Sequence, residues 1–371
     1  MRIAIVGCGQ LSRMLALAGI PMGIKFSFIA EGDEDSRCVE QLGSVVRWQP
    51  GANNNNNNVG DLYAALGKPL LLTVEKEQVD TDILYALQEY CTVHPNPAAF
   101  AACQHRYREK QLLEKLSIPC VDYCYGLPAD AQAAGLDLPL VVKSCRHGYD
   151  GKNQWVLKTA RDLADFLGQA REERYIVERQ VAFEREISQV SVRSIKGEIC
   201  HYPLTENWHE RGMLVRSLAP APGVSASLRR CAQDYVCRIM EALDYVGVLA
   251  MECFVVGDEL LVNELAPRVH NSGHWTQSGG LCSQFENHLR ALFGMPLGSA
   301  RMPGAVGMFN LIGIERPPLD CAPADGALHW YDKTVRRGRK LGHINFCGAT
   351  VEAVGEEIRD LVAAYTLRPV R

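Results

Sequence analysis

The chain has 371 residues, of which 47% are hydrophobic and 22% are charged, and its formal net charge is −4. This length predicts two or three packed domains, and the composition excludes wholesale disorder. The charge argues against nucleic acid as a partner, and no window approaches the roughly 18 uninterrupted apolar residues of a membrane span. The first residues lack a signal peptide and the 14 cysteines are scattered, so we expect a cytoplasmic protein with reduced thiols.

Short apolar strands alternate with helical segments through the first hundred residues. We expect a helix at 10–18, stopped by Gly19, and strands at 2–6, 24–29, 44–48 and 70–74. This alternation predicts a parallel sheet covered by helices, in a domain of residues 1–97. The six asparagines at 53–58 have no core-forming capacity, so we interpret them as an exposed loop or a placeholder for undetermined residues.

A glycine loop, GCGQLS at 7–12, joins the first strand to the first helix. Backbone N–H groups in such a loop can bind an anion at the helix N-terminus. A dinucleotide-binding loop would carry glycine in place of Ser12, with Glu31 or Asp33 as the ribose-binding acid. The loop therefore favours a phosphate-bearing ligand, while an NAD or FAD site and a purely structural turn stay open.

After residue 97 the pattern changes to a mostly antiparallel unit, and a smaller unit follows from residue 293. We expect domains at 98–292 and 293–371. The expected helices span 98–116, 228–243 and 354–364, and the expected strands span 138–143, 154–157, 175–178, 186–192, 200–203, 246–256 and 259–265.

One of these strands ends at Lys143 and is followed by a cationic loop with two glycines, SCRHGYDGKN at 144–153. A lysine at a strand end is a point charge suited to phosphate, and the loop can fold over a triphosphate. The G-x-x-x-x-G-K-[ST] motif is absent. On these residues alone, an ordinary hairpin with a solvated lysine is the simpler interpretation.

Two glutamates, Glu252 and Glu264, lie in consecutive apolar strands joined by a turn at 257–259. A three-residue turn places them opposite one another, whereas a two-residue turn places Asn263 opposite Glu252. Facing carboxylates destabilise a sheet unless a cation neutralises them. Oxygen-only ligands suit Mg²⁺ bridged to substrate phosphates, so we expect a magnesium site, with a glutamate solvated at a sheet edge as the alternative.

Two polar segments follow, APRVHNSGHWT at 266–276 and the cationic KTVRRGRK at 333–340. A loop so rich in functional groups, between a strand and a helix, is more often a site than a spacer. A cationic run is by itself most simply a solvated face.

Together these stretches resemble the ATP-grasp superfamily and, more closely, the 5-(carboxyamino)imidazole ribonucleotide synthetase family. GCGQLSRM at 7–14 is similar to the family's GGGQLGRM, TVEKE at 73–77 stands where the family has E-x-E, and GYDGKNQ at 148–154 is similar to GGYDGRGQ. The segments at 251–254, 263–276 and 329–343 match almost letter for letter. The resemblance covers nearly the whole chain.

The resemblance implies a fold that combines α/β and α+β parts. The expected architecture has an N-terminal Rossmann-like parallel-sheet domain, a central two-lobed ATP-grasp domain and a small C-terminal domain. It implies a cytoplasmic homodimeric ligase of purine biosynthesis that carboxylates aminoimidazole ribonucleotide with bicarbonate and ATP. Carboxyphosphate, or CO₂ released from it, would be the activated intermediate, and two Mg²⁺ ions would assist.

The resemblance also implies roles for individual residues. The metal ligands would be Glu252 and Glu264. The ATP-binding positions would be Arg106, Lys143, Gly148, Tyr149, Asp150, Gly151, Lys152, Gln154, Glu178, Arg179, Gln180, Val181, Glu186, His209, Asn263 and Glu264. The positions that surround the ribonucleotide and bicarbonate would be Gln10, Leu11, Glu75, Tyr149, Asp150, Lys152, Asn271, Arg339 and Lys340. The catalytic residues would be Asp150, Arg268, His270 and Lys340, with Asp150 taking the proton of the acceptor amine.

Three alternatives stay open from the sequence. A sister ATP-grasp ligase, formate-dependent glycinamide ribonucleotide transformylase, is disfavoured by the motif at 329–343. A dinucleotide-dependent oxidoreductase explains the glycine loop but gives no role to Glu252, Glu264 and the cationic segment. A non-catalytic nucleotide-binding subunit is disfavoured by the intact carboxylate pair.

Overall fold

The computed structural model of the chain describes residues 1–49, 58–146, 148, 153–169, 174–279, 282–315 and 326–366. The predicted site residues Tyr149, Asp150, Gly151 and Lys152 lie outside these ranges, as does the asparagine run except Asn58. Among the described residues, no helix has the length and apolar character needed to cross a bilayer.

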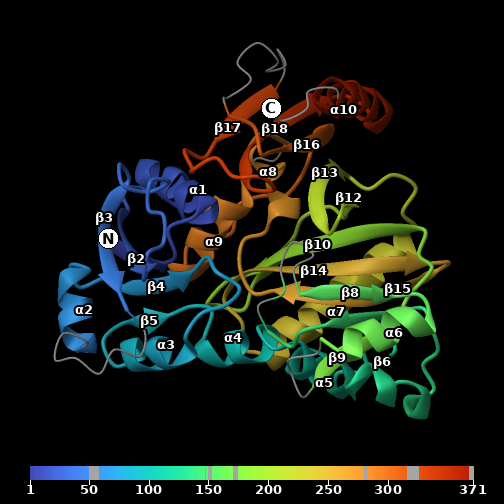
Figure 1. Cartoon of the computed structure of the whole chain (residues 1–371). Helices are drawn as coiled ribbons and strands as arrows, with labels where there is room; N and C mark the ends of the chain where they lie inside the picture. Colours follow the sequence, from blue (N-terminus) through green and yellow to red (C-terminus); the bar gives the residue numbers. More distant parts are fainter. Residues whose placement is uncertain are drawn as a thin grey trace.

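A parallel sheet forms the N-terminal domain, as predicted (Figure 1). Its strand order is β3 (Gly43–Trp48), β2 (Lys25–Glu31), β1 (Arg2–Val6), β4 (Leu71–Val74) and β5 (Thr92–Val93). Successive side chains of a strand face opposite sides, so Ile3 and Ile5 pack with α1 (Gln10–Gly19), which continues into η1 (Ile20–Met22). Ala4 and Val6 pack on the other face with α2 (Val59–Ala65) and α3 (Thr81–Gln88).

The helix expected at 98–116 is two helices, α4 (Pro97–Cys103) and α5 (Arg106–Lys115). His105 is extended at the break, and the side-chain amide oxygen of Gln104 accepts from the N–H of Val79. The N–H of Arg106 donates to the carbonyl of Cys145 instead of continuing the first helix. The prediction of one continuous helix is therefore wrong, and the break places Arg106 at the start of α5.

A small antiparallel sheet forms one lobe of the central region, in the order β6 (Tyr123–Gly126), β9 (Tyr175–Arg179), β7 (Leu140–Lys143) and β8 (Gln154–Leu157). The helix α6 (Ala160–Leu167) covers it, and Phe166 packs with Val142 and Tyr175. Two short turns, η2 (Pro128–Asp130) and η3 (Gln132–Ala134), complete this lobe.

A large antiparallel sheet joins the rest of the central region to the C-terminal region. Its order is β15 (Glu259–Ala266), β14 (Gly247–Val256), β10 (Arg185–Arg193), β12 (Thr205–Glu210), β13 (Met213–Ala219), β16 (Ala305–Ile312), β18 (Lys340–Gly348) and β17 (Gly326–Trp330), and β11 (Ile199–His201) pairs with β10. The C-terminal strands thus extend the central sheet through the β13–β16 pairing. The strands β12, β13 and β16 to β18 were not predicted from the sequence, and the domain boundaries stay predictions.

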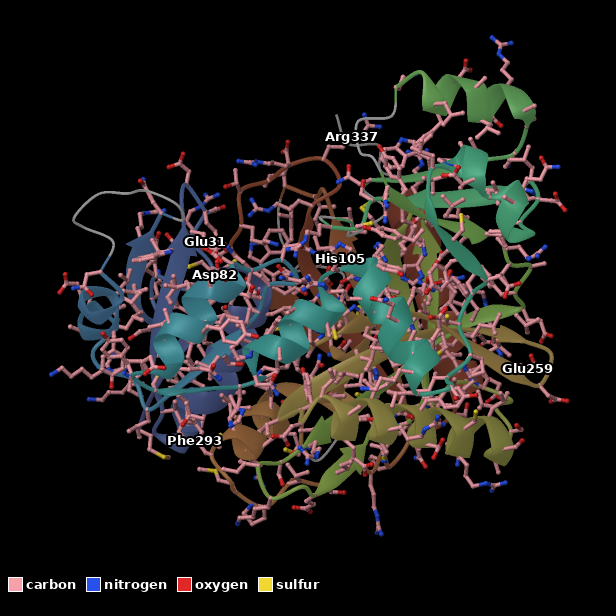
Figure 2. The ribbon with its side chains drawn as sticks, turned by 90° about the horizontal axis from the view of Figure 1, so that it is seen from below. Glu31, Asp82, His105, Glu259, Phe293 and Arg337 are labelled. Carbon is pink, nitrogen blue, oxygen red and sulfur yellow. The ribbon has the colours of Figure 1, made fainter. Side chains whose placement is uncertain are left out.

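Helices cover the large sheet and link it to the N-terminal domain. The helix α7 (Ala226–Ala242) packs on β14 and β15, while α9 (Gln284–Leu292) packs between β14 and α1. Two short elements, η4 (Asn271–Gly273) and α8 (Thr276–Gly279), follow β15, and α10 (Val351–Thr366) covers β16 and β18. Seen from below, His105 lies between the N-terminal domain, marked by Glu31 and Asp82, and Glu259 at the tip of the β14–β15 hairpin (Figure 2).

Candidate active site

The β14–β15 hairpin places the two glutamates opposite one another through a register that the sequence did not predict. Its turn has two residues, because Val256 pairs with Glu259. That turn alone would place Asn263 opposite Glu252, but a β-bulge shifts the register and pairs Glu252 with Glu264. Of the two turn lengths that the sequence left open, the two-residue turn is present, and the bulge nevertheless places the two glutamates opposite one another.

Alternation along β14 explains why Glu252 faces the site. Met251 and Cys253 pack with α7 in the apolar core, so Glu252 projects from the opposite face of the sheet. There it lines a cavity of about 750 Å³. The bulge residue Asn263 accepts a hydrogen bond from Nζ of Lys143 at 3.1 Å.

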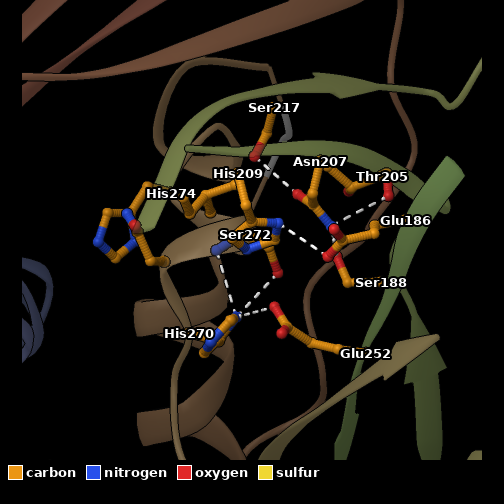
Figure 3. Close-up of polar contacts among 12 residues, drawn as sticks. Glu186, Ser188, Thr205, Asn207, His209, Ser217, Glu252, His270, Ser272 and His274 are labelled. Atoms are coloured by element: carbon orange, nitrogen blue, oxygen red, sulfur yellow. Dashed lines mark hydrogen bonds and ion pairs between the residues drawn. The ribbon is translucent and has the colours of Figure 1, made fainter. Parts of the chain in front are cut away.

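The two carboxylates have unequal surroundings. Arg106 donates to Oε2 of Glu264 at 3.1 Å. Burial alone would raise the pKa of Glu264, but Arg106 and Lys143 bring it below its usual value. Burial raises the pKa of Glu252 to about 8, and the charge of Glu264 adds to this effect. Its buried Oε1 has no hydrogen-bond partner among the described residues and lies 3.7 Å from Nδ1 of His270 (Figure 3).

This pair fits a divalent cation. A bound Mg²⁺ would neutralise the repulsion between these two carboxylates and would give the unpartnered oxygen a ligand. Mg²⁺ commonly binds one or two protein carboxylates and completes its coordination shell with phosphates and water. Among the described residues, no group of three or more histidine, cysteine, aspartate or glutamate side chains is placed to hold a metal ion. Glu252 and Glu264 alone could therefore hold an ion that a nucleotide also binds.

Lysine side chains surround a third buried carboxylate, Glu178. It forms ion pairs with Lys143 at 2.5 Å and with Lys110 at 2.8 Å. Burial opposes its ionisation, but the two lysines outweigh burial and lower the pKa of Glu178 to about 2. Lys143 stands at the end of β7, as predicted, so its ammonium group is fixed between Glu178 and Asn263. Lys110 was not predicted from the sequence to be a site residue.

His209 and Glu186 form a further pair in the cavity region, with Nδ1 and Oε2 2.8 Å apart. They come from the neighbouring strands β12 and β10 (Figure 3). Burial on its own lowers the pKa of His209, but the Glu186 carboxylate outweighs it, so the pKa lies above the ordinary value. The carboxylates of Glu186, Glu252 and Glu264 therefore all favour the protonated form of this imidazole.

Other predicted ATP-binding residues lie outside the lining of this cavity. Gly148 accepts from Arg106 through its carbonyl at 3.1 Å. Arg179 instead pairs with Asp122 and donates to the carbonyl of Gly135, so its guanidinium is committed outside the cavity. Of the predicted ATP-binding residues that the structure describes, only His209 and Glu264 line the cavity itself. The lining does not include Arg106, Lys143, Gly148, Gln154, Glu178, Arg179, Gln180, Val181, Glu186 or Asn263.

The glycine loop binds an anion that belongs to the chain itself. The carboxylate of Glu75 accepts from the N–H groups of Gly9 at 2.7 Å, Leu11 at 3.2 Å and Ser12 at 3.3 Å. A Cβ atom on Gly9 would lie 2.6 Å from Oε1 of Glu75, so this approach requires glycine. The expected phosphate at this helix N-terminus is therefore replaced by Glu75, which also lines the cavity.

The cationic segment docks on the N-terminal domain and lines the cavity. Lys333 donates to the side chain of Gln10 at 2.6 Å. Asp35 accepts from Oγ1 of Thr334 at 2.7 Å and from Arg339 at 3.2 Å. The two ends of the segment are therefore partly buried against the N-terminal domain and the cavity, whereas residues 335–338 between them are exposed. Asp35 is a member of this region that the sequence did not indicate.

The polar loop after β15 forms another wall. Arg268 pairs with Glu77 and donates to the carbonyl of Val269, and burial lowers its pKa to about 10. Burial and the charge of Arg268 hold the pKa of His270 well below its ordinary value. The predicted residues that the cavity brings together are Gln10, Leu11, Glu75, His209, Glu252, Glu264, Arg268, His270, Asn271, Arg339 and Lys340.

Comparisons with known proteins agree with this geometry. Residues 1–104 match the ribonucleotide synthetase pre-ATP-grasp domain, residues 111–285 the ATP-grasp domain, and residues 306–357 the phosphoribosylaminoimidazole carboxylase C-terminal domain. The fold and the carboxylate site thus define an ATP-grasp ligase.

Individual relatives narrow this class. The N5-carboxyaminoimidazole ribonucleotide synthase of Pseudomonas aeruginosa is 40% identical over 371 residues, which cover 98% of this chain and 100% of that relative. The structure of the corresponding synthetase from Thermus thermophilus has a TM-score of 0.90, 40% identity and full coverage of both chains. A synthase from Aspergillus clavatus, in complex with ADP and aminoimidazole ribonucleotide, has a TM-score of 0.84 at 26% identity, over 98% of this chain and 97% of that one. The chain belongs to the N5-carboxyaminoimidazole ribonucleotide synthase family.

Proposed function

We propose that the chain carboxylates aminoimidazole ribonucleotide with bicarbonate and ATP in purine biosynthesis, giving N5-carboxyaminoimidazole ribonucleotide, ADP and phosphate. The observation that carries this proposal is one cavity of about 750 Å³ that holds the Glu252–Glu264 pair together with Arg339 and Lys340. The pair suits a nucleotide-bound cation, and the cations suit an anionic second substrate. The Aspergillus clavatus relative, bound to ADP and aminoimidazole ribonucleotide, supports the same pairing of ligands.

The first step makes bicarbonate reactive. A bicarbonate oxygen attacks the γ-phosphorus of ATP, the bond from that phosphorus to ADP breaks, and carboxyphosphate forms. Lys143 and Arg106 hold the phosphates by charge. Glu252 and Glu264 would hold Mg²⁺, two ions in our proposal, which would neutralise charge on the phosphates.

The second step transfers the carboxyl group. The amine nitrogen attacks the carbon of carboxyphosphate, or of CO₂ released from it, and phosphate leaves while the nitrogen loses a proton. Nδ1 of His270 accepts from the N–H of Ser272 at 3.3 Å, and its lowered pKa keeps the ring neutral. Nδ1 also lies 2.9 Å from Oγ of Ser272, which can donate to it. We propose the tautomer with the proton on Nε2, which can donate to a carboxylate or phosphate oxygen. Asp150, our proposed base, belongs to the part of the chain that is not described.

The cationic side chains near His270 have the charge needed to bind carboxyphosphate, which is an anion. Arg268 remains charged at neutral pH, because its pKa is lowered only to about 10. Lys340 lines the same cavity and helps to keep His270 neutral. We propose that these two cations hold bicarbonate and then carboxyphosphate, while Arg339 holds the ribonucleotide. A homodimer and a cytoplasmic location also stay proposals.

Phosphate release from ATP tests the function. We expect full release only when aminoimidazole ribonucleotide and bicarbonate are both present, with one carboxylated product for each phosphate. Glycinamide ribonucleotide with formate is the control for the sister ligase. Equal turnover with that pair, or turnover that does not depend on bicarbonate, would contradict the proposal.

A further inference from the structure

A buried glutamine that no motif marked holds the backbone of His270. Gln284 is the first residue of α9, and its side chain is completely buried. Its Oε1 accepts from the N–H of His270 at 2.9 Å, and its Nε2 donates to the carbonyl of His270 at 2.6 Å. One planar amide therefore engages both polar backbone groups of a single loop residue.

The surrounding loop is built around this amide. A Cβ atom on Gly273 would lie 2.7 Å from Oε1 of Gln284, so only glycine leaves room for the side chain. Thr276 accepts from the N–H of Gln284 through Oγ1 at 3.0 Å, and Nδ1 of His274 lies 3.3 Å from Nε2. Contacts with Gln284 thus explain why glycine stands at 273 and threonine at 276 in the segment HNSGHWT.

A second amide pair holds the next residue from the other side. Asn271 donates to Asn310 at 3.1 Å, and Asn310 donates back at 2.7 Å and to the carbonyl of Leu214 at 2.8 Å. The loop is therefore held at the backbone of His270 by α9 and at the side chain of Asn271 by β16. His270 sits at the cavity, with its ring beside Glu252 (Figure 3).

We infer that Gln284 is a positioning residue, which holds His270 in the geometry that carboxyl transfer needs. This inference rests on the proposed function. Gln284 is not part of the cavity lining, as described, so it acts through His270. A misplacement of about 1 Å in a reacting group can cost on the order of 10²-fold in rate. A displaced His270 leaves carboxyphosphate formed but poorly used, and the intermediate then hydrolyses.

The Gln284→Met variant tests the inference, because methionine has a similar volume and removes both hydrogen bonds. Its matched control is Gln189→Met. Gln189 is equally buried in β10 and donates to the carbonyls of Val190 at 3.0 Å and Tyr202 at 2.8 Å, away from the cavity lining. In Gln284→Met we expect kcat per folded molecule to fall roughly tenfold or more, with fewer carboxylated products per phosphate released and a KM for ATP within about twofold. In Gln189→Met we expect a lower thermal midpoint with unchanged product per phosphate.

A second variant covers a failure to fold. Gln284→Glu keeps the volume and the acceptor for the N–H of His270, so it should retain more coupling than Gln284→Met. Two results would overturn the inference. One is a normal kcat with full coupling of product to phosphate release, either in folded Gln284→Met or in Gln284→Glu at reduced thermal stability. The other is a Gln189→Met variant that loses as much coupling as Gln284→Met. Failure of the proposed function is distinct, because the unmodified protein would then show no phosphate release dependent on aminoimidazole ribonucleotide and bicarbonate.

Discussion

Two regions of the cavity bury carboxylates in different ways. At the start of α1, Glu75 accepts from the backbone N–H groups of Gly9, Leu11 and Ser12. In the β14–β15 hairpin, Glu252 faces Glu264 and leaves a buried oxygen without a partner among the described residues. Burial raises the pKa of both Glu75 and Glu252, so burial does not distinguish them. Their hydrogen-bond partners distinguish them. Glu75 accepts from backbone N–H groups of the fold, whereas Glu252 requires a cation.

The largest expected effect comes from breaking the carboxylate pair. Glu264→Gln keeps the volume but removes one charge, so we expect the rate of carboxylation to fall on the order of 10²-fold or more. Steady-state product formation measures it. The control is Glu259→Gln, an exposed glutamate at the other end of the same strand. Turnover near normal in Glu264→Gln would remove the pair from the mechanism.

The cationic wall should affect the second substrate selectively. Loss of a charge-assisted hydrogen bond is worth about 1.5–3 kcal/mol, so Arg339→Met should raise the KM for aminoimidazole ribonucleotide by roughly 10-fold or more while the KM for ATP stays unchanged. Asp35→Asn removes the partner of Arg339 but keeps the guanidinium, and it should retain most of the affinity. If both KM values rise together in Arg339→Met, a folding defect is the better explanation.

The Glu75 region should show its effect in stability. Glu75→Gln replaces one acceptor oxygen by a donor that faces backbone N–H groups, so we expect unfolding to become easier by about 1–3 kcal/mol. Urea denaturation measures this loss. Glu89, which is exposed in the same domain, provides the control, and Glu89→Gln should change stability by less than about 0.5 kcal/mol. Equal stability of the two variants would show that the fold does not depend on the Glu75 contacts.

Glu178 gives the most specific effect, because its contribution to stability depends on pH. Because its pKa is about 2 in the folded chain and ordinarily 4.5, its charge stabilises the fold above the unfolded pKa, and this contribution disappears as pH falls from about 4.5 towards 2. The unfolding free energies of the unmodified chain and Glu178→Gln should therefore converge across that window. A difference that stays constant between pH 5 and pH 3 would contradict the proposed ion pairs with Lys110 and Lys143.

The sequence predicted the N-terminal sheet and the β14–β15 strands because apolar patterning sets them locally. It could not predict the bulge at Asn263, the break before Arg106 or the β16–β18 extension, since these depend on contacts between distant segments. Motif resemblance identified residues that line the cavity, such as His270 and Lys340.

Resemblance gave no information on partners that lie far away in the chain. Asp35 and Lys110 pair with residues that are distant in sequence, and Gln284 acts through a loop whose shape the sequence does not show. The glycine loop is the clearest case. Its pattern is typical of anion binding, and only the fold reveals that the anion is Glu75.

Manganese binding tests the contrast between the two regions most directly. Mn²⁺ can replace Mg²⁺ and be followed by electron paramagnetic resonance, with a non-hydrolysable ATP analogue present and the analogue alone as the baseline. We predict binding above this baseline in the unmodified chain and in Glu75→Gln, and its loss in the Glu252→Gln, Glu264→Gln double variant. Undiminished binding in the double variant, or loss in a folded Glu75→Gln, would contradict the account.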